Sequence, residues 1–410
     1  MRATISILAA AITLVAAGPA AAQAPPPDAP PAEPAPPEPT PVEPAPIEAT
    51  PTAAVSAEPP PVEPPLPAAE VEAKPSRPWT DRLTLGAGLI LWYYQPLDTG
   101  GDSDFSLFWA NLVVDGKFGK FGVHVDSRFR PTKLRPFFDG PTWVEEAYAH
   151  VGAGPLTVKV GKLYSRLGLF WDGSFYGNVQ VYDGLKLAPD FGVSVEGVAG
   201  AERPQGVRYW GQYFVVDGAT NVSLPGRDTI SIAGARRRNE VVARVEPFTR
   251  LGGGGGELKL GVSGQFLQAD LPAGVEPVYR AAVDASVTRG GFSAWAEVLR
   301  QWGKHVDAFP VAATPATDTM PAVPGRASEL NDYLLVGGQY QLGKLVGRYN
   351  VSYGGYRDES VREWLHVPAI GYAASDNLSV LSELVVWTRN AAGTSSTFDR
   401  SLNVTVNGHF

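Results

Sequence analysis

The carboxyl-terminal stretch Ser401-Leu402-Asn403-Val404-Thr405-Val406-Asn407-Gly408-His409-Phe410 decides the fold. Its even positions are apolar apart from Gly408, and its odd positions are all polar. Successive side chains of a β-strand point to opposite faces of a sheet, so this period of two predicts a strand with one apolar and one polar face. Chain ends usually fray, yet this one closes on a bulky aromatic residue. We therefore expect a terminal strand that is held inside a closed barrel.

The same stretch resembles the C-terminal recognition signal of bacterial outer-membrane barrel proteins, which end in Phe after alternating apolar residues. The resemblance implies that Phe410 acts as a signal for the barrel-assembly machinery. In such a barrel the apolar set of side chains faces lipid and the polar set faces a wet lumen.

The N-terminus has the features of a secretory signal peptide. Met1-Arg2 precede an apolar run from Ile5 to about Val15, and the small residues Ala20-Ala21-Ala22 follow. The apolar run is too short to cross a membrane as a helix. We expect cleavage after the three alanines, so that residues 1–22 form the signal peptide.

Residues 23–78 form a segment that is rich in Pro and Glu. Residues 24–78 contain 21 of the 38 prolines of the chain and nine acidic residues, against only Lys74 and Arg77 as cations. Such a composition cannot bury a core, so we expect a disordered periplasmic segment. Its charge of 2 − 9 = −7 carries most of the formal −8 of the chain. A spacer that reaches towards the cell wall and a solvated tail without a partner both remain open.

The body, residues 79–410, repeats the alternation of the last strand. The clearest example is Phe121 to Arg130, where apolar residues alternate with His124, Asp126 and Arg128. Comparable segments are expected near residues 83–93, 108–114, 143–151, 156–160, 241–245, 258–266, 279–287, 292–298, 345–353 and 378–386. Together they predict an all-β, transmembrane, antiparallel β-barrel of about 16 strands, with 18 possible. Between Asp217 and Arg238 the pattern does not distinguish one strand and a loop from two strands.

Connections between these segments are short on one side and long on the other, which is the arrangement of periplasmic turns and extracellular loops in porins. Gly252 to Gly256 predicts a flexible turn, and His305 to Asn331 predicts an extracellular loop. A further loop, Tyr164 to Asn178, either folds inward and narrows the channel or lies outside with its aromatic residues at the lipid interface. Its candidate constriction residues are Phe170, Trp171, Asp172, Phe175 and Tyr176.

The stretch Trp143-Val144-Glu145-Glu146-Ala147-Tyr148-Ala149-His150, with Val160-Gly161-Lys162 and Leu167-Gly168, resembles the phosphate-selective porin O/P family. The resemblance implies a trimeric channel of 16 strands. In that family anion selectivity relies on a ladder of basic residues.

Motifs for catalysis are missing from the sequence. The five His residues have no metal-ligand spacing such as His-Glu-x-x-His, and no Gly-x-Ser-x-Gly motif occurs. The chain has no Cys, so no disulfide framework holds it together. We therefore expect no enzyme activity, no metal, no cofactor and no nucleic-acid partner.

Charged residues on the predicted inward faces are the candidate functional residues. The cations are Arg128, Arg130, Lys159, Arg208, Arg244, Lys259, Arg280 and Arg348, and the anions are Asp126, Glu146, Glu246, Asp284, Glu297 and Glu383. Their slight basic excess predicts a pore with a weak anion preference. Structural salt bridges between neighbouring strands are an equally good interpretation of each residue. Arg236-Arg237-Arg238 is expected in a loop or interface cluster that contacts lipopolysaccharide phosphates.

The predicted function is an outer-membrane porin, a water-filled channel for passive diffusion of small hydrophilic solutes or anions. The expected partners are the lipid bilayer, lipopolysaccharide and two further copies of the chain in a homotrimer. The alternative is a barrel that serves as a structural anchor or adhesion protein, with the Pro-rich segment or the external loops making the contacts.

Overall fold

The computed structural model describes part of the chain, in twelve ranges. They are residues 82–97, 101–130, 142–169, 173–182, 185–186, 189–216, 236–252, 255–271, 274–303, 329–357, 360–391 and 394–410. The predicted signal peptide and Pro-rich segment lie outside the described residues, as do Phe170, Trp171 and Asp172.

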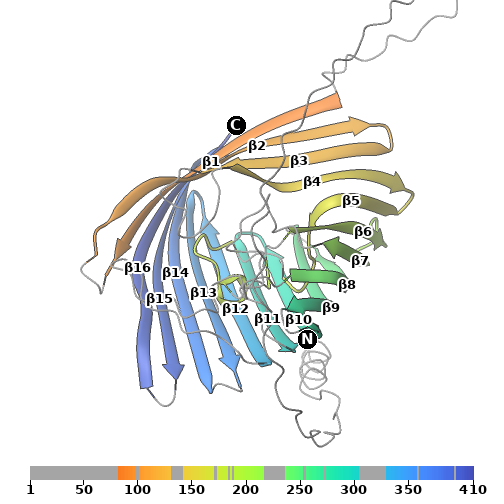
Figure 1. Ribbon diagram of the computed structural model, residues 1–410. Coiled ribbons are helices and arrows are strands. Elements are labelled where there is room, and N and C mark those ends of the chain that lie inside the picture. Colours follow the sequence, from red (N-terminus) through yellow and green to blue (C-terminus); the bar gives the residue numbers. More distant parts are fainter. Residues whose placement is uncertain are drawn as a thin grey trace, which may run out of the picture. The chain divides into compact units, whose positions relative to one another are not determined.

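Sixteen antiparallel strands close into one barrel, in which each strand pairs with its neighbours in sequence (Figure 1). The strands are β1 (Leu83–Pro96), β2 (Asp104–Phe118), β3 (Phe121–Phe129), β4 (Thr142–Ala153), β5 (Leu156–Tyr164), β6 (Pro189–Ala199), β7 (Gln205–Val216), β8 (Arg236–Leu251), β9 (Gly256–Leu271), β10 (Gly274–Arg289), β11 (Phe292–Trp302), β12 (Leu330–Leu342), β13 (Leu345–Tyr356), β14 (Val361–Ser375), β15 (Leu378–Ala391) and β16 (Thr394–His409). A short helix, α2 (Val179–Tyr182), lies between β5 and β6. The prediction of an all-β barrel is confirmed, with 16 strands rather than 18. No helix in the described ranges is long and apolar enough to cross a membrane.

The terminal strand closes the barrel. β16 pairs with β15 on one side and with β1 on the other, where Gly88 lies opposite His409 and Pro96 opposite Ser401. The backbone of Phe410 extends this closure, because its N–H donates to the carbonyl of Ala87 at 2.8 Å and its carbonyl accepts from the N–H of Ala87 at 2.9 Å. The C-terminus is therefore fixed by hydrogen bonds instead of fraying, as the alternating pattern predicted.

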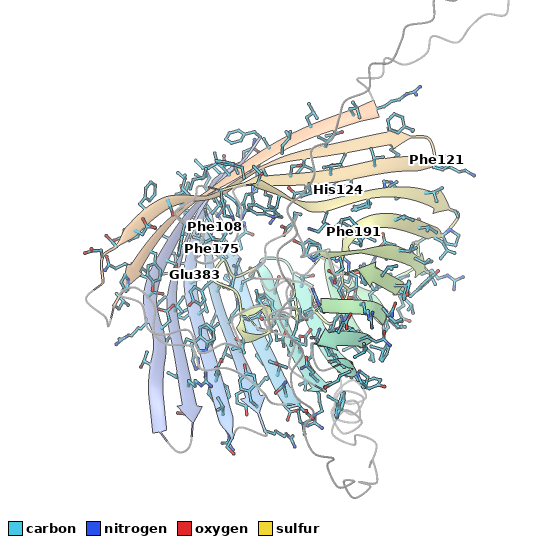
Figure 2. The ribbon with its side chains drawn as sticks, viewed as in Figure 1. Phe108, Phe121, His124, Phe175, Phe191 and Glu383 are labelled. Atoms are coloured by element: carbon cyan, nitrogen blue, oxygen red, sulfur yellow. The ribbon has the colours of Figure 1, made fainter. Side chains whose placement is uncertain are left out.

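Burial in this barrel is the reverse of that in a water-soluble protein. The polar residues Ser401, Asn403 and Thr405 on β16 are 0–1% exposed, whereas the outward-facing Leu85 and Ile370 are 68% and 69% exposed. Large apolar side chains cover the outer surface of the strands (Figure 2). An apolar exterior and a polar interior are what a barrel needs when lipid surrounds it.

Short turns connect the strands at one rim of the barrel. Gly119-Lys120, Gly154-Pro155, Gly290-Gly291 and Gly343-Lys344 each join two strands there. At the opposite rim the connections are longer, such as residues 165–188 between β5 and β6 and residues 303–329 between β11 and β12. The rim with the short turns corresponds to the periplasmic side in outer-membrane barrels.

Two predicted boundaries differ from the structure. Asn331 belongs to β12, and most of the loop predicted from His305 lies outside the described residues. The three arginines at residues 236–238 begin β8 instead of forming a loop cluster. Because neighbouring side chains of a strand alternate, Arg237 is buried and pairs with Asp190 on β6 at 3.4 Å. Arg238 is exposed and pairs with Asp270 on β9.

Candidate functional site

The loop between β5 and β6 folds into the barrel. We call its described residues, 165–169, 173–182 and 185–186, the inward loop. The N–H of Gly168 donates to Oγ of Ser263 on β9 at 2.8 Å, and the N–H of Val179 donates to Oγ of Ser352 on β13 at 3.1 Å. Both serines lie on the inner face of the barrel. Of the two predicted positions for this loop, the inward one is therefore correct for the described residues.

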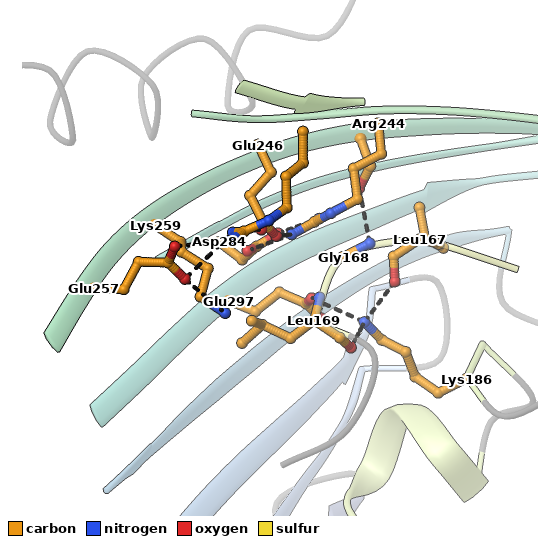
Figure 3. A network of polar contacts seen from close by, with 12 residues as sticks. Leu167, Gly168, Leu169, Lys186, Arg244, Glu246, Glu257, Lys259, Asp284 and Glu297 are labelled. Atoms are coloured by element: carbon orange, nitrogen blue, oxygen red, sulfur yellow. Dashed lines mark hydrogen bonds and ion pairs between the residues drawn. The ribbon is translucent and has the colours of Figure 1, made fainter. Parts of the chain in front are cut away.

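Glu297 on β11 anchors the first part of the inward loop (Figure 3). Its carboxylate accepts from Nζ of Lys186 at 2.8 Å and from the N–H of Leu169. The same Lys186 Nζ donates to the carbonyls of Leu167 at 2.9 Å and Leu169 at 2.7 Å. Gly168 has a φ of +61°, and a Cβ there would overlap the Glu297 carboxylate. This turn of the loop therefore requires glycine.

Glu383 on β15 anchors the second part of the inward loop. It accepts hydrogen bonds from Oγ of Ser174 at 3.0 Å, the N–H of Phe175 at 2.9 Å and the N–H of Tyr176 at 2.8 Å. Figure 2 shows Glu383 beside Phe175 inside the barrel. One buried carboxylate thus satisfies three donors of the loop, which holds its tip against the wall.

Of the five predicted constriction residues, the structure describes Phe175 and Tyr176, and both belong to this tip. The hydroxyl of Tyr176 donates to the carboxylate of Asp399 on β16. Arg348 on β13 donates to the carbonyl of Gly173 and so holds the start of the same segment. The tip is therefore tied to three strands of the wall.

A row of ion pairs runs along the inner face of β5 to β9. Nζ of Lys159 lies 2.6 Å from Glu196, and Arg208 lies 3.1 Å from Glu246 and 2.7 Å from Glu257. Each pair joins side chains of adjacent or next-nearest strands. These contacts match the interpretation of the predicted residues as cross-strand salt bridges.

Arg244 also pairs with a residue two strands away. Its guanidinium crosses β9 and pairs with Asp284 on β10 at 2.6 Å, and it also contacts Glu246 at 2.8 Å. The intervening inward position on β9 is Gly261, where a Cβ would lie 2.4 Å from both the guanidinium and the Asp284 carboxylate. Glycine at this position therefore leaves the space that the pair occupies (Figure 3).

A β-bulge places a carboxylate that alternation does not predict. The register between β3 and β4 shifts at Asp126, so that Glu145 becomes an extra residue on β4. Glu145 is buried, accepts from Nε1 of Trp143 at 2.6 Å and pairs with Arg128 at 3.0 Å. Arg128 also pairs with Asp126 at 2.9 Å. This guanidinium therefore has two carboxylate partners.

The remaining predicted site residues also lie on inward-facing positions, but in different surroundings. Arg130 is buried, with its guanidinium 4.0 Å from the centre of the Trp143 ring. Arg280 is buried and donates to glutamine side chains on β9 and β11. Lys259 lies 3.7 Å from the Glu257 carboxylate. Glu146 is half-buried on β4.

The inner face thus has two different parts. We call the wall that carries Lys159, Glu196, Arg208, Glu257 and Lys259 the open wall, because these side chains keep 19–33% of their surface exposed. We call the wall under the inward loop the sealed wall; there the Lys186–Glu297 pair is 3% and 0% exposed. Water therefore reaches the charges of the open wall.

Sequence reasoning missed five of these charged residues, namely Glu145, Lys186, Glu196, Glu257 and Asp399. Glu196 could have been predicted, because the alternation of Phe191, Val193 and Val195 with the residues between them places Glu196 on the inner face. Lys186 could not have been predicted, since it lies in a loop whose sequence has no alternation of apolar and polar residues.

Comparison with known proteins supports the fold. No family model matches the sequence, and no curated protein is significantly similar to it. The outer membrane channel DcaP of Acinetobacter baumannii has a similar structure, with a TM-score of 0.55 and 12% identity over 80% of this chain and 97% of that chain. Salmonella typhi OmpF in complex with daunomycin gives a TM-score of 0.54 and 12% identity over 80% and 97% of the two chains. An anion-selective porin from Comamonas acidovorans gives 0.51 and 9% over 80% and 99%.

These structural similarities, together with the apolar outer surface and the polar inner face of the barrel, define the class of structure. The chain has the fold of bacterial outer-membrane β-barrel channels, with a loop folded into the barrel and a charged inner wall.

Proposed function

We propose that the protein is an outer-membrane porin that lets small hydrophilic solutes diffuse through a water-filled channel. The observation that carries the proposal is the open wall, where ionised side chains face the interior of a lipid-compatible barrel and remain in contact with water. The Lys186–Glu297 pair under the inward loop, by contrast, is sealed from water.

The ion preference of this channel is weak. The expected basic excess is reduced because Glu145, Glu196 and Glu257 face inward beside Arg128, Lys159 and Arg208. Charges of opposite sign that pair on neighbouring strands largely cancel, so they produce little net potential along the channel. This arrangement supports a general diffusion channel more than the phosphate selectivity that residues 143–150 suggest.

A homotrimer is part of the proposal. OmpT of Vibrio cholerae, solved in a trimer form, gives a TM-score of 0.50 and 11% identity with this chain, over 80% of this chain and 99% of that one. Phe410, with its ring 76% exposed beside the closing strand pair, is the proposed signal for the assembly machinery. Lipopolysaccharide is the proposed partner of the outer rim.

Single-channel recording in a planar bilayer tests the function. We expect stepwise conductance from the folded, heat-modifiable protein, and a reversal potential close to zero under a salt gradient. A folded barrel that never conducts would contradict a porin and favour the structural anchor. Chemical cross-linking of the same preparation in detergent tests the trimer.

A further inference from the structure

Charged side chains gather on the outward face of β11 to β14, close to the rim with the long loops, which we call the outer rim (Figure 1). We call Arg300, Asp332, Arg357 and Arg362 the rim cluster. Arg300 and Asp332 are directly opposite each other on β11 and β12. Gly355 on β13 lies opposite both Asp332 and Arg362, which is on β14. Arg357 follows the end of β13, so the four residues lie at nearly the same depth of the barrel wall.

The rim cluster points away from the lumen. Gln301, the neighbour of Arg300, and Asn331, the neighbour of Asp332, have side chains that are 0% exposed on the inner face. Glu363, the neighbour of Arg362, is also buried there. Because successive side chains of a strand alternate between the two faces, the charged residues beside them lie on the outer surface.

Aromatic rings border the rim cluster and mark the level of the lipid headgroups. Trp302 lies two residues after Arg300 on the same face of β11, with its ring centre 5.9 Å from the Arg300 guanidinium. Tyr353 on β13 and Trp364 on β14 have ring centres 4.8 Å apart. Trp and Tyr on the outer surface of a membrane barrel gather where the hydrocarbon core meets the headgroups. The outer rim is opposite the periplasmic rim, so these are headgroups of the outer leaflet.

Gly355 brings a hydroxyl into the rim cluster. A Cβ at this position would lie 2.5 Å from the hydroxyl oxygen of Tyr353. The phenol group of Tyr353 therefore occupies the space above Gly355, between Asp332 and Arg362. The row of polar groups continues across β13 with a hydroxyl instead of a gap.

Cations outnumber the single anion of the rim cluster. Asp332 accepts from Nε of Arg300 at 2.5 Å and from Nε of Arg357 at 2.6 Å. Arg362 is exposed, and its cross-strand neighbours Gly355 and Asn390 are uncharged. The Arg357 side chain is 54% exposed. Since each guanidinium has five N–H donors, Arg357 and Arg362 can both take further acceptors from outside the barrel.

A second charged site at the outer rim is balanced. Arg238 on β8 lies 3.3 Å from Asp270 on β9, so that one cation meets one anion. The sequence predicted contact with lipopolysaccharide at residues 236–238, but this pair has no excess of positive charge. The rim cluster has three cations around one anion, and it therefore suits an anionic partner better.

We propose that the rim cluster binds the phosphate groups of lipopolysaccharide, the glycolipid of the outer leaflet. The inference rests on the part of the proposed function that makes lipopolysaccharide a partner of the outer rim, and it does not require the channel to conduct. A guanidinium binds phosphate oxygens through two parallel hydrogen bonds. The rings of Trp302, Tyr353 and Trp364 lie where the sugars of the headgroup meet the acyl chains.

Native mass spectrometry of the refolded protein in detergent, titrated with purified diphosphorylated lipid A, tests the proposal. The wild type should bind lipid A, and the double variant Arg357→Gln/Arg362→Gln should bind it about tenfold more weakly. A tenfold change corresponds to about 1.4 kcal/mol, and a hydrogen bond to a charged group contributes energy of that order. Arg238→Gln is the matched control, because it removes an exposed arginine from the same rim; its affinity should equal that of the wild type. Equal affinity of the double variant and the wild type would overturn the inference.

Asp332→Asn distinguishes a lipid site from arginines that only pair with a carboxylate. This variant removes the negative charge beside the bound phosphates and releases Arg300 and Arg357, so it should bind lipid A more tightly than the wild type does. Unchanged or weaker binding by a variant that keeps its heat-modifiable mobility on a gel would contradict the site.

The chemistry of the lipid is tested in the same titrations. EDTA is present throughout, because Asp358 and Glu359 stand between Arg357 and Arg362 in the sequence and a divalent cation could bridge acidic residues to phosphate. Binding that requires added Mg²⁺ would overturn an arginine site. Equal affinity for dephosphorylated lipid A, or for phosphatidylglycerol, would overturn recognition of the phosphorylated glycolipid. Conductance is recorded separately: a barrel that binds lipid A but never conducts contradicts the channel and supports the rim cluster.

Discussion

The open wall and the sealed wall each contain a pair of one lysine and one glutamate, but the two pairs have opposite environments. Lys159 and Glu196 pair across β5 and β6 and remain in contact with water, while Lys186 and Glu297 pair under the inward loop and are almost completely buried. Exposed pairs contribute little to stability because water and salt screen them, whereas a buried charge that loses its partner is strongly unfavourable. The two walls therefore differ in role: the sealed one positions the loop, and the open one is accessible to water.

The largest expected effect is the loss of the buried anchor. Glu297→Ala leaves Lys186 without its carboxylate, and we expect a loss of about 3–5 kcal/mol in the free energy of unfolding. The matched variant Glu196→Ala on the open wall should lose less than about 1 kcal/mol. Urea unfolding of the barrel in lipid vesicles, followed by tryptophan fluorescence, measures both. Equal losses would show that the two walls do not differ as described.

Release of the loop tip is the second expected effect. Glu383→Ala removes the acceptor of three hydrogen bonds from Ser174, Phe175 and Tyr176. Hydrogen bonds to a charged group contribute about 1.5–3 kcal/mol each, so the tip should detach while the barrel stays closed. Single-channel traces of Glu383→Ala should show higher conductance than the wild type and new substates. The conductance of Glu383→Gln, which keeps an acceptor oxygen, should lie between those of the wild type and Glu383→Ala. A trace identical to that of the wild type would mean that the tip does not narrow the channel.

The same residues show how much of the structure can be predicted from the sequence. Alternation predicted the 16 strands and the inward face of Asp284, Glu297 and Glu383, because the pleat of a strand fixes which side each residue takes. It failed at Glu145, where one extra residue in a bulge reverses the alternation. It also placed the arginines at 236–238 in a loop cluster, although strand β8 turns Arg237 and Arg238 to opposite faces.

The inward loop could not be derived from the sequence. Its anchors connect residues that are far apart in the chain, as when Leu169 meets Glu297 and Tyr176 meets Glu383. A period of two carries information about which face a residue occupies, but none about which distant strand a loop will contact. The sequence therefore left the inward and external positions of this loop open.

A smaller effect is expected at Gly261 on β9. Gly261→Ala places a methyl group against the Arg244–Asp284 pair, which must separate or shift. We expect a loss of about 1–3 kcal/mol, the usual range for overpacking. Gly264→Ala is the control, because a Cβ at that outward-facing, exposed position on β9 meets only a carbonyl oxygen at 3.9 Å. The urea concentrations at the midpoint of unfolding are compared between the two variants. When both variants unfold with the same dependence on urea concentration, these midpoints measure the difference in stability.

The smallest effect concerns ion selectivity. Lys159→Gln should shift the reversal potential towards cations and Glu196→Gln should shift it towards anions, because each leaves the other charge unbalanced. Both shifts should shrink at about 1 M salt, where charges are screened within about 3 Å. Lys117→Gln, an exposed residue beside the short β2–β3 turn, is the control. Two shifts of the same sign would contradict the pairing of these residues.

Access from water to the open wall tests the central claim most directly. The natural chain has no Cys, so Lys159→Cys and Ser263→Cys each present one thiol to a bulky water-soluble thiol reagent. The measurement is the single-channel current before and after the reagent is added, with labelling checked by mass spectrometry. We predict that the Lys159→Cys channel is labelled and its current falls in steps, while Ser263→Cys, under the inward loop, is not labelled. A labelled Lys159→Cys channel with unchanged current, or labelling only at residue 263, would contradict a water-filled path along the open wall.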